Sequence, residues 1–228
     1  MKRRLLPILM TLVLVCALPI WAAFVTSGDV TNPLVSTAGA TLPDLQAKID
    51  AAADNATITL DSDTTITETL VITGKTLTLD LNGCTLRMTG TGSVLKVSGR
   101  ATLTIQDSSA EGTGTITGGN AVDGGGVYID NNATLKMTGG CITDCRAEYG
   151  GGVYVDNNAT LKMTGGCITG CHASRGGGGI YSSGNLYMGG TAKIEKCTGS
   201  DDAIWNREKS DIYADGGTVD GTVNNQGT

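Results

Sequence analysis

Apolar and polar residues alternate in short segments along most of this chain, and in its middle the alternation is repeated almost letter for letter. The segment GGGVYIDNNATLKMTGGCITDC begins at Gly124, and GGGVYVDNNATLKMTGGCITGC begins 26 residues later, at Gly150. A looser third copy occupies residues 177–197. A strand-like repeat of this length is typical of a solenoid, in which each repeat packs against its neighbours.

Each copy contains three short segments with the two-residue period of a β-strand, separated by glycine-rich corners. The apolar positions of the first copy are Val127 and Ile129, then Leu135 and Met137, then Ile142. Three strands and three corners describe one coil of a parallel β-helix.

Comparable pairs of apolar residues extend this pattern toward both ends of the chain. Before the repeats, these pairs are Ile58 and Leu60, Leu70 and Ile72, Leu77 and Leu79, Leu86 and Met88, Leu95 and Val97, and Leu103 and Ile105. After the repeats, the pattern weakens but continues to Val223. We therefore predict an all-β parallel β-helix of about seven coils over residues 55–228, with Leu135, Leu161 and Leu186 in one inward column.

The first 23 residues have the organisation of an export signal. Residues 2–4 are positively charged, residues 5–18 are mostly apolar, and Ala22 and Ala23 provide a small-residue cleavage site. The alternative is an uncleaved anchor, because the apolar stretch is about long enough to span a bilayer. Either way we expect a secreted or cell-surface protein, which contacts a membrane only through this segment if it is not removed.

A linker and a short helix are predicted between the signal and the β-helix. Residues 24–40 are rich in Ser, Thr and Gly and show no periodicity. Within residues 41–54, Leu45, Ile49 and Ala52 share one helical face. A single amphipathic helix before a solenoid is best interpreted as an N-terminal cap that covers the first coil.

Composition limits both the core and the partners of the protein. The chain contains 34 Gly, one Phe and one His, so its core must consist of aliphatic side chains. Its formal net charge is -6. Such a surface repels nucleic acids and anionic membranes, and we expect no nucleic-acid partner.

The corners of the repeats resemble those of a known family. The GGGVY and GGGIY corners, each followed by an Ile-x-x-Cys segment ending at Cys145, Cys171 or Cys197, resemble the paired Gly-Gly-Ala-Ile and Phe-x-x-Asn repeats of chlamydial polymorphic membrane proteins. This chain has Gly in place of Ala, Ile in place of Phe and Cys in place of Asn. The resemblance covers roughly residues 55–215, and it implies a right-handed, pectate-lyase-like β-helix with a surface or adhesin role.

Cysteines recur at equivalent positions of neighbouring coils. Strands stack at about 4.7–4.9 Å, which lies within the roughly 4.4–6.8 Å Cα separation of a disulfide. Cys141 should therefore stack on Cys167, and Cys145, Cys171 and Cys197 should form a second column. In the coil before, we expect Asn120 at the position of Cys145.

Three states are open to these cysteines. If Cys16 of the signal is set aside, the chain has an even set, which favours structural disulfides in an exported protein. The candidates are Cys84, Cys141, Cys145, Cys167, Cys171 and Cys197. The alternatives are buried free thiols and a metal site formed by the Cys-x3-Cys pairs near His172.

Aromatic residues occupy the outward positions of the first strand in successive coils. This stripe consists of Tyr128, Tyr154, Tyr181 and Trp205, with Asp130 and Asp156 at its margin. Aromatic rings beside carboxylates and carboxamides suit a carbohydrate ligand. Alternatively, the rings only stabilise neighbouring strands. Asp130 and Asp156 could share a calcium ion, and no other cofactor is predicted.

Three functions are compatible with the sequence. The first is an adhesion or binding module for an extracellular glycan or for a host or matrix surface. The second is a polysaccharide lyase or hydrolase, for which Asp201 and Asp202 are the only adjacent acid pair in the β-helix. The polygalacturonase motifs Asn-Thr-Asp, Gly-His-Gly and Arg-Ile-Lys are absent. The third is a structural spacer without a ligand.

Overall fold

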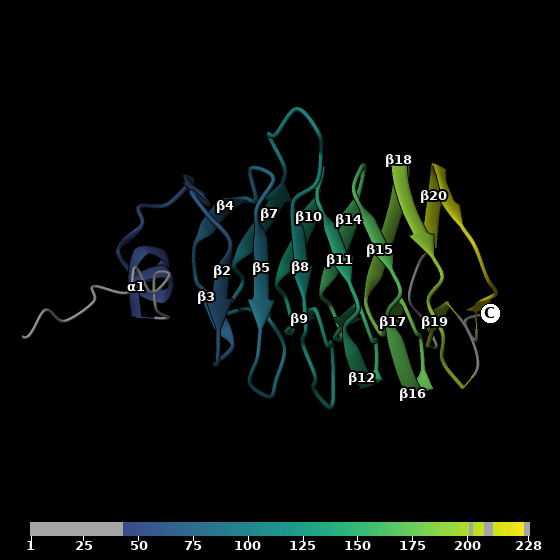
Figure 1. Ribbon diagram of the computed structural model, residues 1–228. Helices are drawn as coiled ribbons and strands as arrows, with labels where there is room; N and C mark the ends of the chain where they lie inside the picture. Colours follow the sequence, from purple (N-terminus) through teal and green to yellow (C-terminus); the bar gives the residue numbers. More distant parts are fainter. Residues whose placement is uncertain (1–42, 201–202, 208–211, 226–228) are drawn as a thin grey trace, which may run out of the picture. The chain divides into compact units, whose positions relative to one another are not determined.

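The computed structural model describes residues 43–200, 203–207 and 212–225, which form a parallel β-solenoid of about six turns with one short N-terminal helix (Figure 1). The predicted signal (1–23), the predicted linker (24–40) and the acid pair Asp201 and Asp202 lie outside the described residues. In the described part of the chain, no helix is long and apolar enough to cross a membrane.

Strands of successive coils pair in parallel along three faces, and we number these faces as three sheets. The first sheet contains β1 (Ala56–Thr59), β4 (Thr76–Asp80), β7 (Thr102–Gln106), β10 (Thr134–Met137), β14 (Thr160–Met163), β18 (Asn185–Glu195) and β20 (Ile212–Val219). The second contains β2 (Thr64–Ile66), β5 (Thr85–Met88), β8 (Thr115–Thr117), β11 (Cys141–Thr143), β15 (Cys167–Thr169) and the distal half of β18.

The third sheet contains β3 (Leu70–Thr73), β6 (Leu95–Ser98), β9 (Val127–Ile129), β13 (Val153–Val155), β17 (Ile180–Ser182), β19 (Ile204–Asn206) and β21 (Val223–Asn225). A small additional sheet pairs β12 (Arg146–Tyr149) with β16 (His172–Gly176). The turn count is about six rather than the predicted seven. The right-handed sense stays a prediction, which agrees with the strong preference of parallel crossovers for that hand.

Ladders of aliphatic side chains fill the interior. Leu135 pairs with Leu161 and Leu161 with Leu186, and all three side chains are fully buried. The same column continues toward the N-terminus through Leu103 and Leu77. The predicted inward column is therefore confirmed. Each fully buried Leu contributes about 1.5–3 kcal/mol relative to an exposed one.

Glycine is required at these corners because neighbouring backbone and side-chain atoms leave no room for a Cβ. Gly150 has a φ of 65°, and a Cβ there would collide with the carbonyl oxygen of Val153. A Cβ at Gly152 would collide with Ile168 and lie 3.5 Å from Cys171 Sγ. The run of three glycines thus makes room for the Ile and Cys side chains of the following corner.

The predicted capping helix is confirmed as α1 (Pro43–Ala51), which is shorter than the predicted 41–54. Its Leu45 and Ile49 side chains are buried against the first coil. The Gln46 side-chain amide accepts a hydrogen bond from Val71 N at 2.9 Å and donates one to Val71 O at 3.1 Å. The helix therefore satisfies backbone groups at the open edge of β3, which a solenoid end otherwise leaves unpaired.

A lysine from the first full coil holds the end of this helix. Lys75 Nζ donates hydrogen bonds of 2.9–3.0 Å to the carbonyl oxygens of Ile49, Asp50 and Ala52. A cation at a helix C-terminus is favoured by the unpaired carbonyls and by the helix dipole. The cap is thus fixed by charge as well as by packing.

Two aspartates organise the corner that carries the inserted loop at 107–114. Asp80 accepts hydrogen bonds from Gln106 Nε2, Ser108 N and Asn82 N. Asp107 accepts them from Gly83 N, Gly114 N and Ser109. Burial alone would raise the pKa of both carboxyls, but these hydrogen bonds outweigh it and hold each pKa below its usual range.

The six cysteines within the described residues divide into one disulfide and four free thiols. Cys141 and Cys167 are bonded, as predicted, with a Cα separation of 4.5 Å. The wider disulfide set is not formed, because Cys84, Cys145, Cys171 and Cys197 are free. Cys145 and Cys171 are buried, as in the free-thiol alternative. Hydrogen bonds with the thiols of Cys145 and Cys197, together with burial, raise the pKa of Cys171.

In the coil before the column of Cys145, Cys171 and Cys197, the residue at the equivalent position differs from the prediction. Asn120 pairs with Arg146 rather than with Cys145, so the expected equivalence of Asn120 and Cys145 is wrong. Arg146 N also donates a hydrogen bond to Gly119 O at 2.8 Å. This bond is expected when Arg146 pairs with Asn120 in a parallel ladder, so Gly119 rather than Asn120 lies beside Cys145. Among the described residues, no group of three or more His, Cys, Asp or Glu side chains is arranged to hold a metal ion.

We expect Leu161→Ala to lower the free energy of unfolding by about 2–5 kcal/mol, because it leaves a cavity in a fully buried column. Urea denaturation measures this change. Lys162→Ala on the same strand is the control, since its exposed side chain should contribute less than about 0.5 kcal/mol. A similarly small loss for Leu161→Ala would show that the column is not core.

Replacing Cys141 and Cys167 together by Ser should cost about 3 kcal/mol, since the disulfide closes a loop between residues separated by 26 positions. Thermal or urea unfolding measures the loss, and Cys84→Ser provides a control at a free thiol. Mass mapping of the non-reduced protein should recover a peptide that joins the two positions. Free alkylation of both thiols before reduction would contradict the assignment.

Candidate ligand-binding groove

A groove of about 580 Å³ lies over the N-terminal part of the third sheet. Residues of β3, β6 and β9 contribute to it, together with the corner loops around 91–93 and 120–123. The side chains that matter below are Val71, Ser93, Lys96, Val122, Asp123 and Tyr128. The groove therefore includes one ring of the predicted aromatic stripe.

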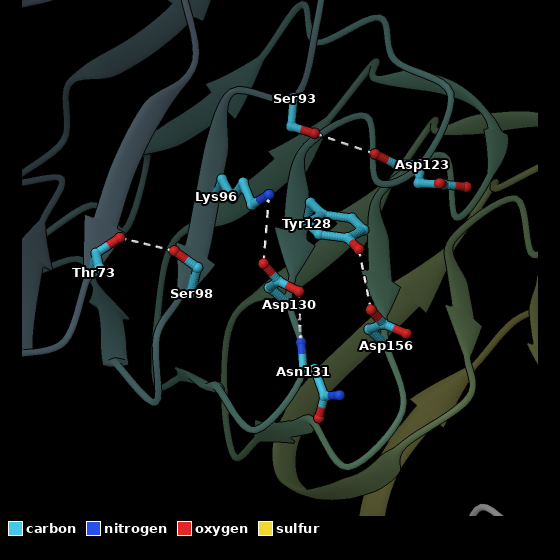
Figure 2. Close-up of polar contacts among 9 residues, drawn as sticks. All are labelled: Thr73, Ser93, Lys96, Ser98, Asp123, Tyr128, Asp130, Asn131 and Asp156. Atoms are coloured by element: carbon cyan, nitrogen blue, oxygen red, sulfur yellow. Dashed lines mark hydrogen bonds and ion pairs between the residues drawn. The ribbon is translucent and has the colours of Figure 1, made fainter.

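Backbone hydrogen bonds fix the two loops that form its wall. Gly92 N donates to Asn120 O at 2.7 Å, and Asn120 N donates to Gly92 O at 3.0 Å. Ser93 Oγ donates to the backbone oxygen of Asp123 at 3.1 Å (Figure 2). These contacts tie consecutive coils together, so the groove is held in place before any ligand arrives.

Apolar side chains are unusually exposed along this groove. Val122 is 61% exposed and Val71 is 37% exposed, although both are large aliphatic residues. Ring and aliphatic surface next to a few fixed polar groups is the usual composition of a small-molecule or glycan site. The groove thus has both the apolar surface and the polar rim that such a site requires.

Tyr128 is fixed by charged neighbours on both sides. Lys96 Nζ lies 5.0 Å from the centre of the Tyr128 ring and 3.4 Å from Asp130 Oδ2. The Tyr128 hydroxyl donates to Asp156 Oδ2 at 3.1 Å (Figure 2). Burial, followed by the charge of Asp156, raises the pKa of Tyr128, so the hydroxyl stays protonated and keeps this bond.

The rings of the stripe stack face to face on one another, so their faces are not presented to solvent. Tyr128 and Tyr154 are stacked with centroids 5.4 Å apart, and Tyr154 and Tyr181 with centroids 5.2 Å apart. Trp205 continues the register beside Tyr181. Burial raises the pKa of Tyr154 to about 12. Both faces of Tyr154 are turned toward neighbouring rings, so a sugar ring has no free face to lie on there.

The stripe therefore has two parts with different roles. Tyr154 and Tyr181 belong to a stack that joins neighbouring strands, as in the structural interpretation. Only Tyr128, at the N-terminal end of the stack, lines the groove. The faces of the Tyr128 ring are covered by Lys96 and by Tyr154, so we restrict the expected ligand contact from four rings to the edge of this one.

Asp130 and Asp156 do not require a shared cation to explain their stacking. Asp130 is bonded to Lys96 and accepts a hydrogen bond from Asn131 N at 2.8 Å. Asp156 accepts from Tyr128 and from Asn157 N at 2.7 Å. Each carboxylate has its own donors, and calcium between them stays a prediction without further support.

Asp123 is a groove residue that the sequence interpretation missed. Burial, followed by the charges of Glu148 and Asp156, raises its pKa. In the ladder, Asp123 pairs with Tyr149 of the next coil. Alignment of the 26-residue copies could have found it, because it is the acid that stands directly before the first GGG corner, where the second copy has an aromatic residue.

A second concavity of about 310 Å³ lies on the first sheet, far along the chain. Tyr187 and Tyr213 stack there with centroids 4.8 Å apart, beside Lys162 and Asp215. The sequence interpretation missed this pair as well, because its partner strands β18 and β20 lie outside the near-identical copies.

This chain matches no protein-family model. No curated protein and no solved structure matches it either. Its function is therefore inferred from the groove and from the sequence.

Tyr154→Ala should lower the free energy of unfolding by about 1–3 kcal/mol, because it removes two aromatic contacts at the centre of the stack. Chemical denaturation measures the loss. Val122→Ala, at an exposed position outside the stack, should change stability by less than about 0.5 kcal/mol. Equal stability of Tyr154→Ala and the unmodified protein would show that the stack has no structural role.

Proposed function

We propose that the protein is a secreted or cell-surface binding module whose groove holds a short segment of an extracellular glycan. The observation that carries this proposal is the groove itself, where the edge of the Tyr128 ring, two exposed valines and fixed polar groups lie together on one sheet. Rings and aliphatic groups pack against the C–H faces of sugars, while rim groups bond their hydroxyls.

One feature of the sequence and one of the structure support a location outside the cell. Residues 1–23 have the organisation of an export signal, and the disulfide is a bond that persists in oxidising compartments. The resemblance of the corners to chlamydial polymorphic membrane proteins supports an adhesin role on a pectate-lyase-like β-helix. A partner on a host or matrix surface agrees with both.

Polysaccharide cleavage is the second candidate function, and Asp123 is the observation that favours it. A glycosidase needs one carboxyl that stays protonated and one that is ionised. Burial, followed by the charges of Glu148 and Asp156, raises the pKa of Asp123, and Asp156 is the second carboxyl group near it. Release of reducing ends from a bound glycan, lost in Asp123→Asn, would establish this activity.

The full chain should bind at least one glycan on an array, and Tyr128→Ala should weaken that binding by about tenfold or more, as expected for a central aromatic contact. Titration calorimetry with the glycan identified on the array measures the change. Tyr213→Ala is the matched control, because it removes a stacked ring from the other concavity.

Two outcomes would contradict the proposal. If no glycan binds to the full chain, the structural spacer becomes the better account. If Tyr128→Ala binds as tightly as the unmodified protein while Tyr213→Ala does not, the ligand site is the second concavity.

A further inference from the structure

Three of the free cysteines form a column along one corner of the solenoid, namely Cys145, Cys171 and Cys197. In the ladder directly after them, Arg146 pairs with His172 and His172 pairs with Thr198. His172 N donates a hydrogen bond to Cys145 O, and Thr198 N donates one to Cys171 O, both at 2.9 Å. The three cysteines are therefore in register, and the thiol of the central Cys171 interacts with the other two.

The spacing of the coils permits a disulfide between neighbours in this column, but not between its two ends. Four residues earlier in the same coils, Cys141 and Cys167 are bonded at a Cα separation of 4.5 Å. Cys145 and Cys197 are two coils apart, which is about 9–10 Å and exceeds the roughly 6.8 Å that a disulfide can span. Any disulfide within the column therefore includes Cys171, and the third cysteine remains a thiol beside it.

One end of the column is accessible to solvent. Cys197 is partly exposed, whereas Cys145 and Cys171 are completely buried. A reagent in solution therefore meets Cys197 first.

The neighbouring thiol also makes Cys197 more reactive, because the thiolate is the form of cysteine that attacks an oxidant. A hydrogen bond with the Cys171 thiol lowers the pKa of Cys197, although burial opposes this effect. Cys84 is a natural comparison, since it is also partly exposed. Burial, followed by the charge of Asp63, raises the pKa of Cys84, and the ladder places Gly114 rather than a cysteine beside it.

We propose that the column is a thiol–disulfide exchange site that reacts with hydroperoxides at Cys197 and passes the resulting disulfide inward. The Cys197 thiolate attacks the peroxide, the O–O bond breaks, and Cys197 becomes a sulfenic acid while the leaving oxygen takes a proton from solvent. The Cys171 sulfur then bonds to the Cys197 sulfur, and water leaves. The two thiols have lost two electrons, which the peroxide has gained.

The third thiol completes the exchange. The Cys145 thiolate attacks the Cys171 sulfur, so that a Cys145–Cys171 bond forms and the Cys171–Cys197 bond breaks. Cys197 leaves as a thiolate and takes up the proton that Cys145 released, and no further oxidant is consumed. The inward position is favoured because a disulfide, unlike a buried thiol, has no donor that needs a partner. A thiol is thereby restored at the exposed end of the column.

A time course with equimolar hydrogen peroxide tests this on the full chain, in which mass mapping has first found the three column thiols free. Samples are quenched by alkylation and mapped by mass spectrometry with fragmentation. We expect a Cys171–Cys197 disulfide first, then a Cys145–Cys171 disulfide, while Cys197 becomes open to alkylation again. Cys84 should still be a thiol at the end.

Single variants separate the three roles. Cys197→Ser should slow formation of the column disulfide roughly tenfold or more, because the remaining thiols are buried and oxidation follows exposure. Cys171→Ala should leave a sulfenic acid at Cys197, which dimedone traps. Cys145→Ala should form the Cys171–Cys197 disulfide and no second isomer. Cys84→Ser is the matched control, and it should change none of these results.

Three results would overturn the proposal. They are oxidation of Cys84 as fast as that of Cys197, a column disulfide that forms as fast in Cys197→Ser as in the unmodified protein, and a Cys171–Cys197 disulfide that never gives way to Cys145–Cys171. The time course of the unmodified protein gives the order of events by itself, so the test does not depend on the folding of the two alanine variants. None of these results bears on glycan binding, which the column does not involve.

Discussion

In-register stacking of parallel strands places each side chain beside the equivalent side chain of the next coil, at roughly 4.8 Å. Every notable feature of this molecule follows from that spacing. Leucines form a continuous buried ladder, two cysteines reach disulfide distance, and tyrosines stack face to face. Where the stacked residues are acids, the same spacing brings like charges together, and Lys96 and Tyr128 supply the compensating contacts.

The repeat predicted the register but not the details that depend on it. The 26-residue period was enough to place Leu161, Cys141 and Tyr154 in columns, because equivalent positions must stack in a solenoid. It could not show that the Tyr154 faces are covered, since ring orientation depends on side-chain rotamers. It also overestimated the disulfides, because stacking permits a bond without requiring one, and Cys145 and Cys171 remain thiols.

The repeat could predict the fold but not the groove, because most of the groove lies outside the near-identical copies. Its wall comes from loops around 91–93 and 120–123, which belong to coils before the near-identical copies and pair through non-repeated backbone contacts. Asp123 stands where the next coil has Tyr149, and this departure from the repeat adds an acid to the wall. The candidate groove therefore lies where the solenoid deviates from its own pattern, while the buried columns lie where it does not.

Stacking also limits where a ligand can bind, because Tyr128 is the ring of the stripe that borders a groove. A crystal structure of the full chain with the glycan identified on the array tests this most directly. We expect the glycan to lie in the groove, in contact with the edge of Tyr128 and with Val71 and Val122. A glycan lying along Tyr154 and Tyr181, or bound only beside Tyr187 and Tyr213, would contradict the account.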